Sequence, residues 1–270
     1  MHRIFTMVAL ALSALAHPID LNTVYVPEGG DIRGVVAQAP PTMTGGGNLT
    51  TLVNHAAASW ESAIADNWTI EIKYGWSNSI GGALAQYYGW FMPFGDGRHF
   101  MGRILFNPDF PWFADNTPDA GEEYGNYVES HQDLGGGEMN VGKRYTSAGG
   151  AAAGRYDLLT AAIHELGHSF SIGIGPLWTS EVSDGDIDVV SPRRRAGSRI
   201  PVGNDHLALE NSVMYFGQAT GERRLLTEVD IEAAMEINEH REYGEPVPEP
   251  ATIGVLSLGL FALLRRRNVS

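Results

Sequence analysis

Two histidines and a glutamate stand at a spacing that suits metal chemistry. They lie in His164-Glu165-Leu-Gly-His168, inside the apolar stretch AAIHELGHSF. Residues four positions apart share one face of a helix, so both imidazoles can reach one ion. Neutral imidazole suits Zn²⁺, and Glu165 stands beside the ion, where it can hold a water and act as general base. The spacing therefore predicts a helical zinc site with His164 and His168 as ligands.

A catalytic zinc needs a third protein ligand and keeps one position for water. One histidine and four acidic residues downstream are candidates: His206, Glu181, Asp184, Asp205 and Glu210. The histidines at positions 55 and 131 lack ligand spacing, and the one at position 240 is expected to be exposed beyond the last helix.

Three helices are expected around this motif. Apolar residues recur at helical spacing over residues 49–66. A second helix is predicted to begin at Asp157, which can cap it, and to run through His168. A third is predicted from Thr227, with Asp230 completing a variant of the capping box. The metal motif thus lies in the middle helix.

Strands are expected between the first two helices. Residues 68–74 alternate apolar and polar side chains, and residues 99–107 and 137–145 are further strand candidates. The order of helices and strands predicts an α+β fold, with one domain over residues 49–245. Residues 17–48, rich in proline and glycine, are expected to form an N-terminal arm that is irregular from residue 27 onward.

The composition excludes several kinds of protein. The chain has 270 residues and no cysteine, which excludes disulfides, Cys-based zinc sites and thiol catalysis. Its formal net charge is -14, which argues against a nucleic-acid partner held by phosphate contacts. Hydrophobic residues make up 43% of the chain, enough for a globular core.

The N-terminus has the three parts of a secretory signal peptide. Arg3 supplies the positive charge, residues 4–15 are apolar, and Ala14 and Ala16 give the small residues of a cleavage site. Residues 1–16 are therefore predicted to be a signal peptide, and the mature chain to be exported.

The C-terminus also has three parts. Pro-Glu-Pro at residues 248–250 precedes an apolar run at 251–264, and three arginines follow at 265–267. A basic cluster after an apolar run favours a cytoplasmic stop. This ending resembles the PEP-CTERM sorting signal of Gram-negative bacteria. The resemblance implies a sorting segment at 246–268, an exosortase-type enzyme as partner, and transient anchoring in the inner membrane through 251–264 before the protein reaches the cell surface or the medium.

The chain also resembles the zincin metalloproteases, and their metzincin branch in particular. Besides the His-Glu-x-x-His motif, Ser-Val-Met214-Tyr resembles the Met-turn of matrixins, and residues 226–231 resemble the start of their last helix. Three positions depart from the pattern: Ser171 replaces a glycine, Ile174 replaces the usual third histidine, and Phe216 replaces a tyrosine that some metzincins use.

This resemblance implies a zincin-like fold with a mixed twisted sheet, an active-site helix and a C-terminal helix. It favours His206 as third ligand, because His206 precedes Met214 by eight residues. Residues 172–203 then form an insertion like one that leishmanolysin-like metzincins tolerate. An acidic third ligand would instead resemble the thermolysin-like branch.

Two functions from different classes follow as hypotheses. The first is a secreted or cell-surface zinc-dependent endopeptidase, in which Glu165 is the general base that takes a proton from a zinc-activated water. Its protein substrate would lie as an extended strand along an edge of the sheet, for instance along 137–145. The second is a non-catalytic surface or biofilm-matrix protein that binds metal or polysaccharide. The presence of Glu165 favours the first.

A second metal is a separate hypothesis. Asp184, Asp186 and Asp188 alternate as ligands do in calcium loops, but the following glycine and distal glutamate of an EF-hand are absent. The two interpretations are a Ca²⁺ site and a solvated acidic loop.

Overall fold

A mixed four-stranded sheet forms the base of the molecule. The computed structural model describes residues 19–92, 96–119, 121–147 and 149–244. The strand order is β1-β2-β4-β3. β1 (Asp20–Tyr25), β2 (Thr69–Trp76) and β4 (His99–Phe106) run parallel, and β3 (Ala85–Phe91) closes one edge antiparallel to β4.

Three smaller sheets complete the strands. β12 (Glu222–Leu225), β7 (Glu138–Thr146) and β6 (Asn126–Asp133) form an antiparallel sheet in that order. The other two join β9, β10 and β11, and β5 with β8. Their bounds are Asp186–Asp188, Arg199–Gly203, His206–Leu207, Trp112–Phe113 and Tyr156–Asp157.

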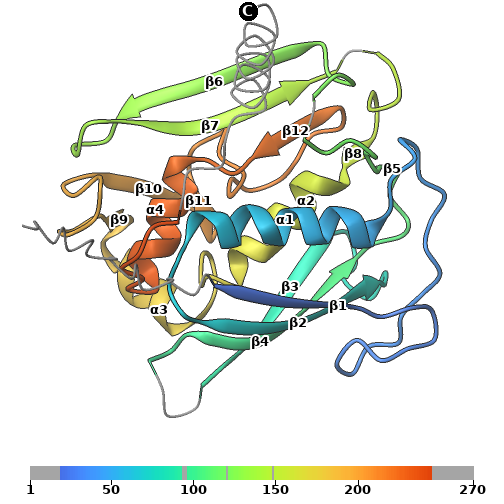
Figure 1. Cartoon of the computed structure of the whole chain (residues 1–270), viewed down its shortest axis with the longest axis horizontal. Helices are drawn as coiled ribbons and strands as arrows, with labels where there is room; N and C mark the ends of the chain where they lie inside the picture. Colours follow the sequence, from blue (N-terminus) through green and yellow to red (C-terminus); the bar gives the residue numbers. More distant parts are fainter. Residues whose placement is uncertain (1–18, 93–95, 120, 148, 245–270) are drawn as a thin grey trace, which may run out of the picture.

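Two helices fill the space above the main sheet. α1 (Leu49–Ala63) and α2 (Leu158–His168) lie between this sheet and the β6–β7 ribbon (Figure 1). The indole N–H of Trp60 on α1 donates to the carbonyl of Ile163 on α2 at 3.0 Å, and its ring packs on Phe170. This contact joins the two helices inside the core. α3 (Gly175–Glu181), a 3₁₀ turn at Val182–Asp184 and α4 (Glu228–Ile237) follow along the chain.

The predicted helices are present, and their caps are confirmed. The side chain of Asp157 accepts from the backbone N–H of Thr160 at 2.9 Å and caps α2. Thr227 and Asp230 form the capping box of α4. The first helix ends at Ala63, three residues before the predicted end.

The predicted strands are also present, and two further features were not predicted from the sequence. β1 is a regular strand inside the region predicted as an arm; it pairs with β2 along its whole length. β7, offered as an edge for substrate, lies between β6 and β12. The structure therefore leaves β3 as the edge strand on the side of α2.

The two predicted targeting segments, residues 1–16 and 246–268 with the apolar run 251–264, lie outside the described residues. Among the described residues, no helix has the length and hydropathy needed to cross a bilayer.

A buried arginine on β12 joins this strand to the start of α2. Arg223 on β12 pairs with Asp115 at 2.8 Å and with Asp157 at 2.9 Å, and all three side chains are at most 1% exposed. Its guanidinium also lies over the ring of Tyr124. Because Asp157 caps α2, this ion pair holds the start of the helix that carries the histidines.

Replacing this arginine is expected to destabilise the fold strongly. In Arg223→Met the buried carboxylates of Asp115 and Asp157 lose their positively charged partner, which costs about 3–5 kcal/mol of unfolding free energy. Arg199→Met is the matched control, because Arg199 is 59% exposed and pairs with surface aspartates; the expected cost there is below about 1 kcal/mol. Urea unfolding measures both, and equal losses would contradict the role of Arg223.

Candidate metal centre

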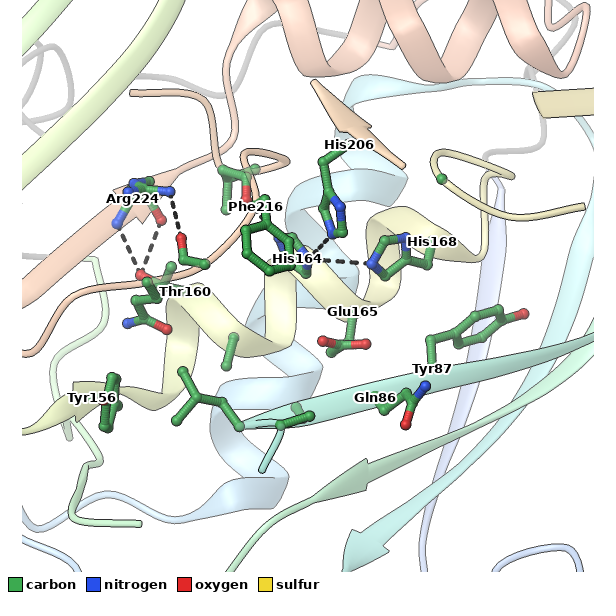
Figure 2. Close-up of a pocket in the computed structure, with 18 of the residues that line it drawn as sticks. Gln86, Tyr87, Tyr156, Thr160, His164, Glu165, His168, His206, Phe216 and Arg224 are labelled. Carbon is green, nitrogen blue, oxygen red and sulfur yellow. Dashed lines mark hydrogen bonds between the residues drawn. The ribbon is translucent and has the colours of Figure 1, made fainter. Parts of the chain in front are cut away.

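α2 presents both motif histidines to one cavity. Its other face is apolar and packed in the core through Leu159, Ala162 and Leu166, so the helix cannot rotate. His164 and His168 are one turn apart, and their Nε2 atoms are 3.2 Å apart. Figure 2 shows the two rings projecting from the same side of the helix.

His206 reaches the same point from a distant part of the chain. A tight turn precedes it, in which Asn204 and Asp205 both take positive φ. Leu207, the residue after His206, donates its N–H to the carbonyl of Met214 at 3.0 Å. This places the Nε2 atom of His206 3.1 Å from that of His164. Ligand atoms of the three histidines all lie within 4.8 Å of one another.

Backbone carbonyls fix the tautomer of all three rings. The Nδ1 atoms of His164, His168 and His206 lie 2.8, 2.6 and 2.6 Å from the carbonyl oxygens of residues 213, 172 and 204. A carbonyl only accepts, so each Nδ1 is the donor and carries the proton. Each neutral ring then has an unprotonated Nε2, and the three lone pairs meet in one place.

This geometry fits a tetrahedral metal ion. Zn–N bonds of about 2.0–2.1 Å imply ligand nitrogens about 3.3 Å apart in a tetrahedron. The two observed separations, 3.1 and 3.2 Å, are close to that value. Three facing lone pairs repel one another, and a cation between them removes the repulsion. The donor set of three imidazoles suits zinc.

The environment keeps the three rings neutral. Burial and the neighbouring histidines lower the pKa of His164 well below its usual value and that of His168 to about 4. Burial also lowers the pKa of His206. Metal ligands must be unprotonated, so these shifts favour metal binding at neutral pH.

Glu165 lies between the helix and the edge of the main sheet. Its carboxyl points toward β3, beside Gln86 and Tyr87 (Figure 2). Burial raises its pKa to about 8, and a hydrogen bond from the Tyr87 backbone partly opposes this. A cation held by the histidines would lower that pKa, because opposite charge favours the carboxylate. The group is thus placed to exchange a proton inside the cavity.

The side chain of Met214 packs against α2. Gly167 lies against its sulfur, and an added Cβ there would overlap the Sδ atom. The turn is fixed to α4, since Asp230 accepts from the Ser212 hydroxyl and from the Met214 N–H. This arrangement also orients the Val213 carbonyl that binds His164. Met214 is therefore structural.

The two departures from the metzincin pattern after α2 have a structural explanation. Ser171 adopts φ 61°, the left-handed conformation that favours glycine. Its hydroxyl donates to the side chain of Asn238, the residue that ends α4. The turn is thus kept without the glycine. Ile174 lines the cavity, while His206 occupies the place beside His164 and His168.

Gly173 sets the distance between this turn and the His206 loop. It has φ 78, and a Cβ would overlap the carbonyl oxygen of Asp205. We expect Gly173→Ala to displace His206 and to weaken zinc binding by about 10–100-fold, the range for disturbed outer contacts. Gly217→Ala is the control, because it also has positive φ but open space around it. Competition with a zinc chelator measures the difference, and equal affinities would contradict the role of Gly173.

A cavity of about 560 Å³ adjoins the three histidines. One wall is β3 with the residues before it, from Gly82 to Tyr87, and the opposite wall is residues 216–218. Phe110 and Tyr156, whose rings meet edge-on at 5.6 Å, also line it, and Figure 2 shows Tyr156 at the end away from the three histidines. The ring of Phe216 meets His206 edge-on at 5.4 Å. Tyr215, the residue before Phe216, packs under the Arg224 guanidinium.

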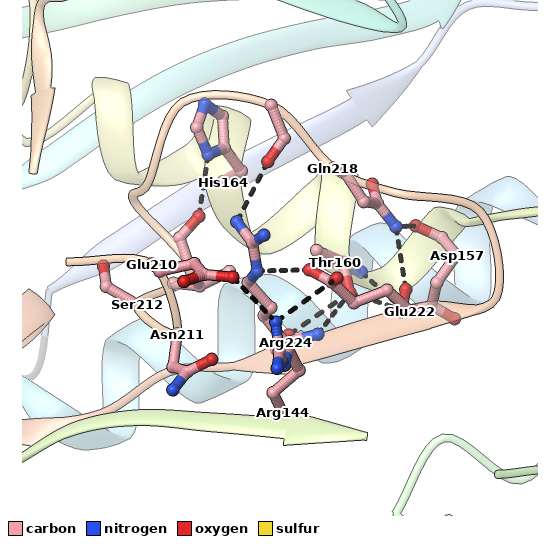
Figure 3. A network of polar contacts seen from close by, with 12 residues as sticks. Arg144, Asp157, Thr160, His164, Glu210, Asn211, Ser212, Gln218, Glu222 and Arg224 are labelled. Atoms are coloured by element: carbon pink, nitrogen blue, oxygen red, sulfur yellow. Dashed lines mark hydrogen bonds and ion pairs between the residues drawn. The ribbon is translucent and has the colours of Figure 1, made fainter. Parts of the chain in front are cut away.

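A charged network stands behind this cavity (Figure 3). Arg224 pairs with Glu222 and donates to the Gly217 carbonyl at 2.9 Å. The Arg144 guanidinium lies 3.2 Å from the Glu210 carboxylate and 3.9 Å from that of Glu222, so it links the two. Burial lowers the pKa of Arg224, and Glu222 opposes this. The positive charge at the cavity wall is therefore largely balanced.

The acidic candidates for third ligand lie outside the histidine cluster. Glu181 accepts from the N–H of Asp188, and Glu210 binds Arg144. Asp205 has positive φ in the turn before His206, and its carboxylate is not among the ligand atoms that gather with the three histidines. The structure thus brings together the three predicted histidines and no predicted carboxylate ligand among the described residues.

One expectation about the remaining histidines is wrong. His240 is 1% exposed, because it packs on Phe170 and lies near Asp66. His55 and His131 are at the surface, each near a carboxylate.

The aspartates at 184, 186 and 188 do come together, but Arg199 binds all three, at 3.6, 2.9 and 3.3 Å. The arginine supplies the positive charge that the calcium hypothesis assigned to an ion.

Sequence reasoning missed two contributors to the site. The wall formed by β3 was not predicted, although its aromatic run Tyr-Tyr-Gly-Trp-Phe is typical of strands. His99 on β4 was also missed: it is fully buried, and its Nδ1 lies 3.0 Å from the carbonyl of Ser169, the residue that ends α2. This contact fixes the end of the helix next to His168.

Comparison with known proteins identifies one segment of the chain. Residues 246–268 match the PEP-CTERM protein-sorting motif. The motif implies recognition by an exosortase-type sorting enzyme and export from the cytoplasm in Gram-negative bacteria. A search of the curated proteins and of the solved structures finds no match to the chain.

Proposed function

We propose that this exported protein is a zinc-dependent endopeptidase with a zincin-like catalytic domain. One observation carries the proposal. The Nε2 atom of His164 lies 3.1 and 3.2 Å from those of the other two histidines, the ligand atoms of all three lie within 4.8 Å of one another, and the Nδ1 of each ring donates to a carbonyl. A carboxyl and an open cavity adjoin them. A purely structural zinc site needs four protein ligands and no base, so this set of residues favours catalysis.

The residues around the site divide the work of hydrolysis. Zinc, when bound to His164, His168 and His206, supplies a Lewis acid that activates water and polarises a carbonyl. Glu165 takes the proton from the water and passes it to the leaving amine. Its burial shields that proton from bulk solvent.

The edge strand β3 suits an extended peptide. One side of β3 pairs with β4, and the other is free of strand partners in the described part of the chain. A substrate strand can bind there through backbone hydrogen bonds, next to Glu165. The cavity beyond the histidines then receives one substrate side chain, and its apolar end at Phe110 and Tyr156 favours a large apolar group.

Digestion of unfolded casein by residues 17–245 tests the proposal. Zinc-loaded protein is expected to produce fragments, the activity to vanish with a chelator, and zinc to restore it. If one zinc binds per chain and no fragment forms, the non-catalytic alternative, a metal-binding surface or matrix protein, gains support. Chelator-resistant cleavage would contradict both.

A further inference from the structure

The chain returns to the body of the domain just before the sorting motif. After α4, the Asp66 carboxylate accepts from the backbone N–H groups of Arg241 and Glu242 at 2.8 and 3.0 Å. The Glu242 carbonyl accepts from Ala65 at 2.8 Å. The N–H of Gly244 donates to the carbonyl of Ala63, at the end of α1, also at 2.8 Å. We call residues 241–244 the docked segment.

Tyr243 is the side-chain anchor of the docked segment. Its hydroxyl donates to Glu232 on α4 at 2.6 Å and accepts from the N–H of Arg194 at 3.1 Å. The Arg194 guanidinium lies 4.0 Å from the centre of its ring. Gly244 approaches α1 so closely that a Cβ would overlap the Ser62 carbonyl oxygen. The docked segment is thus held at several points.

The sorting motif follows on a very short length of chain. The matched motif begins at residue 246, and its first proline of Pro-Glu-Pro is Pro248. Three residues lie between Gly244 and Pro248, and the four steps from Cα to Cα span at most about 14 Å when fully extended. The apolar run begins at residue 251 and starts within about 25 Å of Gly244. A domain of this size has a radius of gyration of roughly 17 Å.

An enzyme that binds the motif next to a membrane therefore competes with the folded domain for space. We propose that the docked segment holds the sorting motif on a short tether, so that the folded domain slows its own processing by the sorting enzyme. Undocking back to Asn238 adds six residues, about 20 Å of reach. Processing at full rate then requires this release.

A linker insertion in the full chain tests the tether. Twelve Gly/Ser residues placed between Gly244 and residue 245 leave the docked segment intact and add a coil of about 20 Å. In a Gram-negative host with the sorting enzyme, pulse-chase with mass analysis of the immunoprecipitated protein gives the rate of tail processing. We expect at least a threefold faster rate. The same insertion between Gly149 and Gly150, in an exposed turn, is the control with an unchanged rate.

A point variant tests the docking itself. Tyr243→Phe removes both hydrogen bonds of the hydroxyl and keeps the ring under Arg194. We expect faster processing, by less than the insertion gives. Tyr88→Phe, which removes a surface hydrogen bond to Gln86, is the matched control. A linker that leaves the rate unchanged or lower overturns the proposal. A faster rate with the linker but not with Tyr243→Phe overturns the role of docking.

Discussion

A Glu165→Gln chain is expected to bind zinc like the wild type and to lose peptide hydrolysis by about 10³-fold. The amide has the same shape and cannot accept the proton of the attacking water, and a general base contributes about 10²–10⁴-fold. The carboxyl is buried, and no cation pairs with it in the part of the chain that the structure describes, so neutralising it leaves no buried cation there unpaired. The fold is therefore expected to persist.

Two readouts separate the role of Glu165 from a structural role. Zinc content per chain should stay at one, while the rate of casein cleavage falls. Glu61→Gln is the matched control, since Glu61 is partly buried and accepts from a backbone N–H, that of Leu21, away from the cavity. Wild-type cleavage by Glu165→Gln would contradict the assignment of the base.

His206→Ala is expected to weaken zinc binding more than 100-fold and to abolish cleavage. Disturbing an outer contact of a ligand already costs about 10–100-fold, and removing the ligand itself exceeds that. His131→Ala, at an exposed position on β6, should change neither quantity. Equilibrium dialysis with zinc measures the affinities.

The same variant discriminates between the possible third ligands. If His206→Ala kept zinc affinity and activity, an acidic group would have to complete the site, as in the thermolysin-like branch. Glu181, the neighbour of Asp188, and Asp205, beside His206, would then be the next residues to replace.

The elements with strong periodicity or caps were predictable from the sequence. α2 and α4 begin where Asp157 and Thr227 cap them. β6 escaped prediction because almost all of its side chains are exposed on both faces, so no apolar alternation marks it. β1 was missed because only one of its side chains, Leu21, is buried.

The site was predictable only in part, for a physical reason. Two ligands one helical turn apart form a local pattern, whereas His206 arrives through a turn and a short strand that depend on the whole insertion. Its position eight residues before Met214 was the sequence signal that favoured His206. The β3 wall and the carbonyl partners of the rings are set by tertiary packing, which periodicity does not encode.

Titration of zinc into metal-free residues 17–245, with casein cleavage followed at each addition, tests whether zinc bound by the three histidines makes this protein a peptidase. Cleavage is expected to rise linearly and to saturate at one zinc per chain, and Glu165→Gln is expected to take up the same zinc without cleaving. Saturated binding at one zinc per chain with no cleavage by the wild type, under conditions where its fold is intact, would contradict a peptidase function.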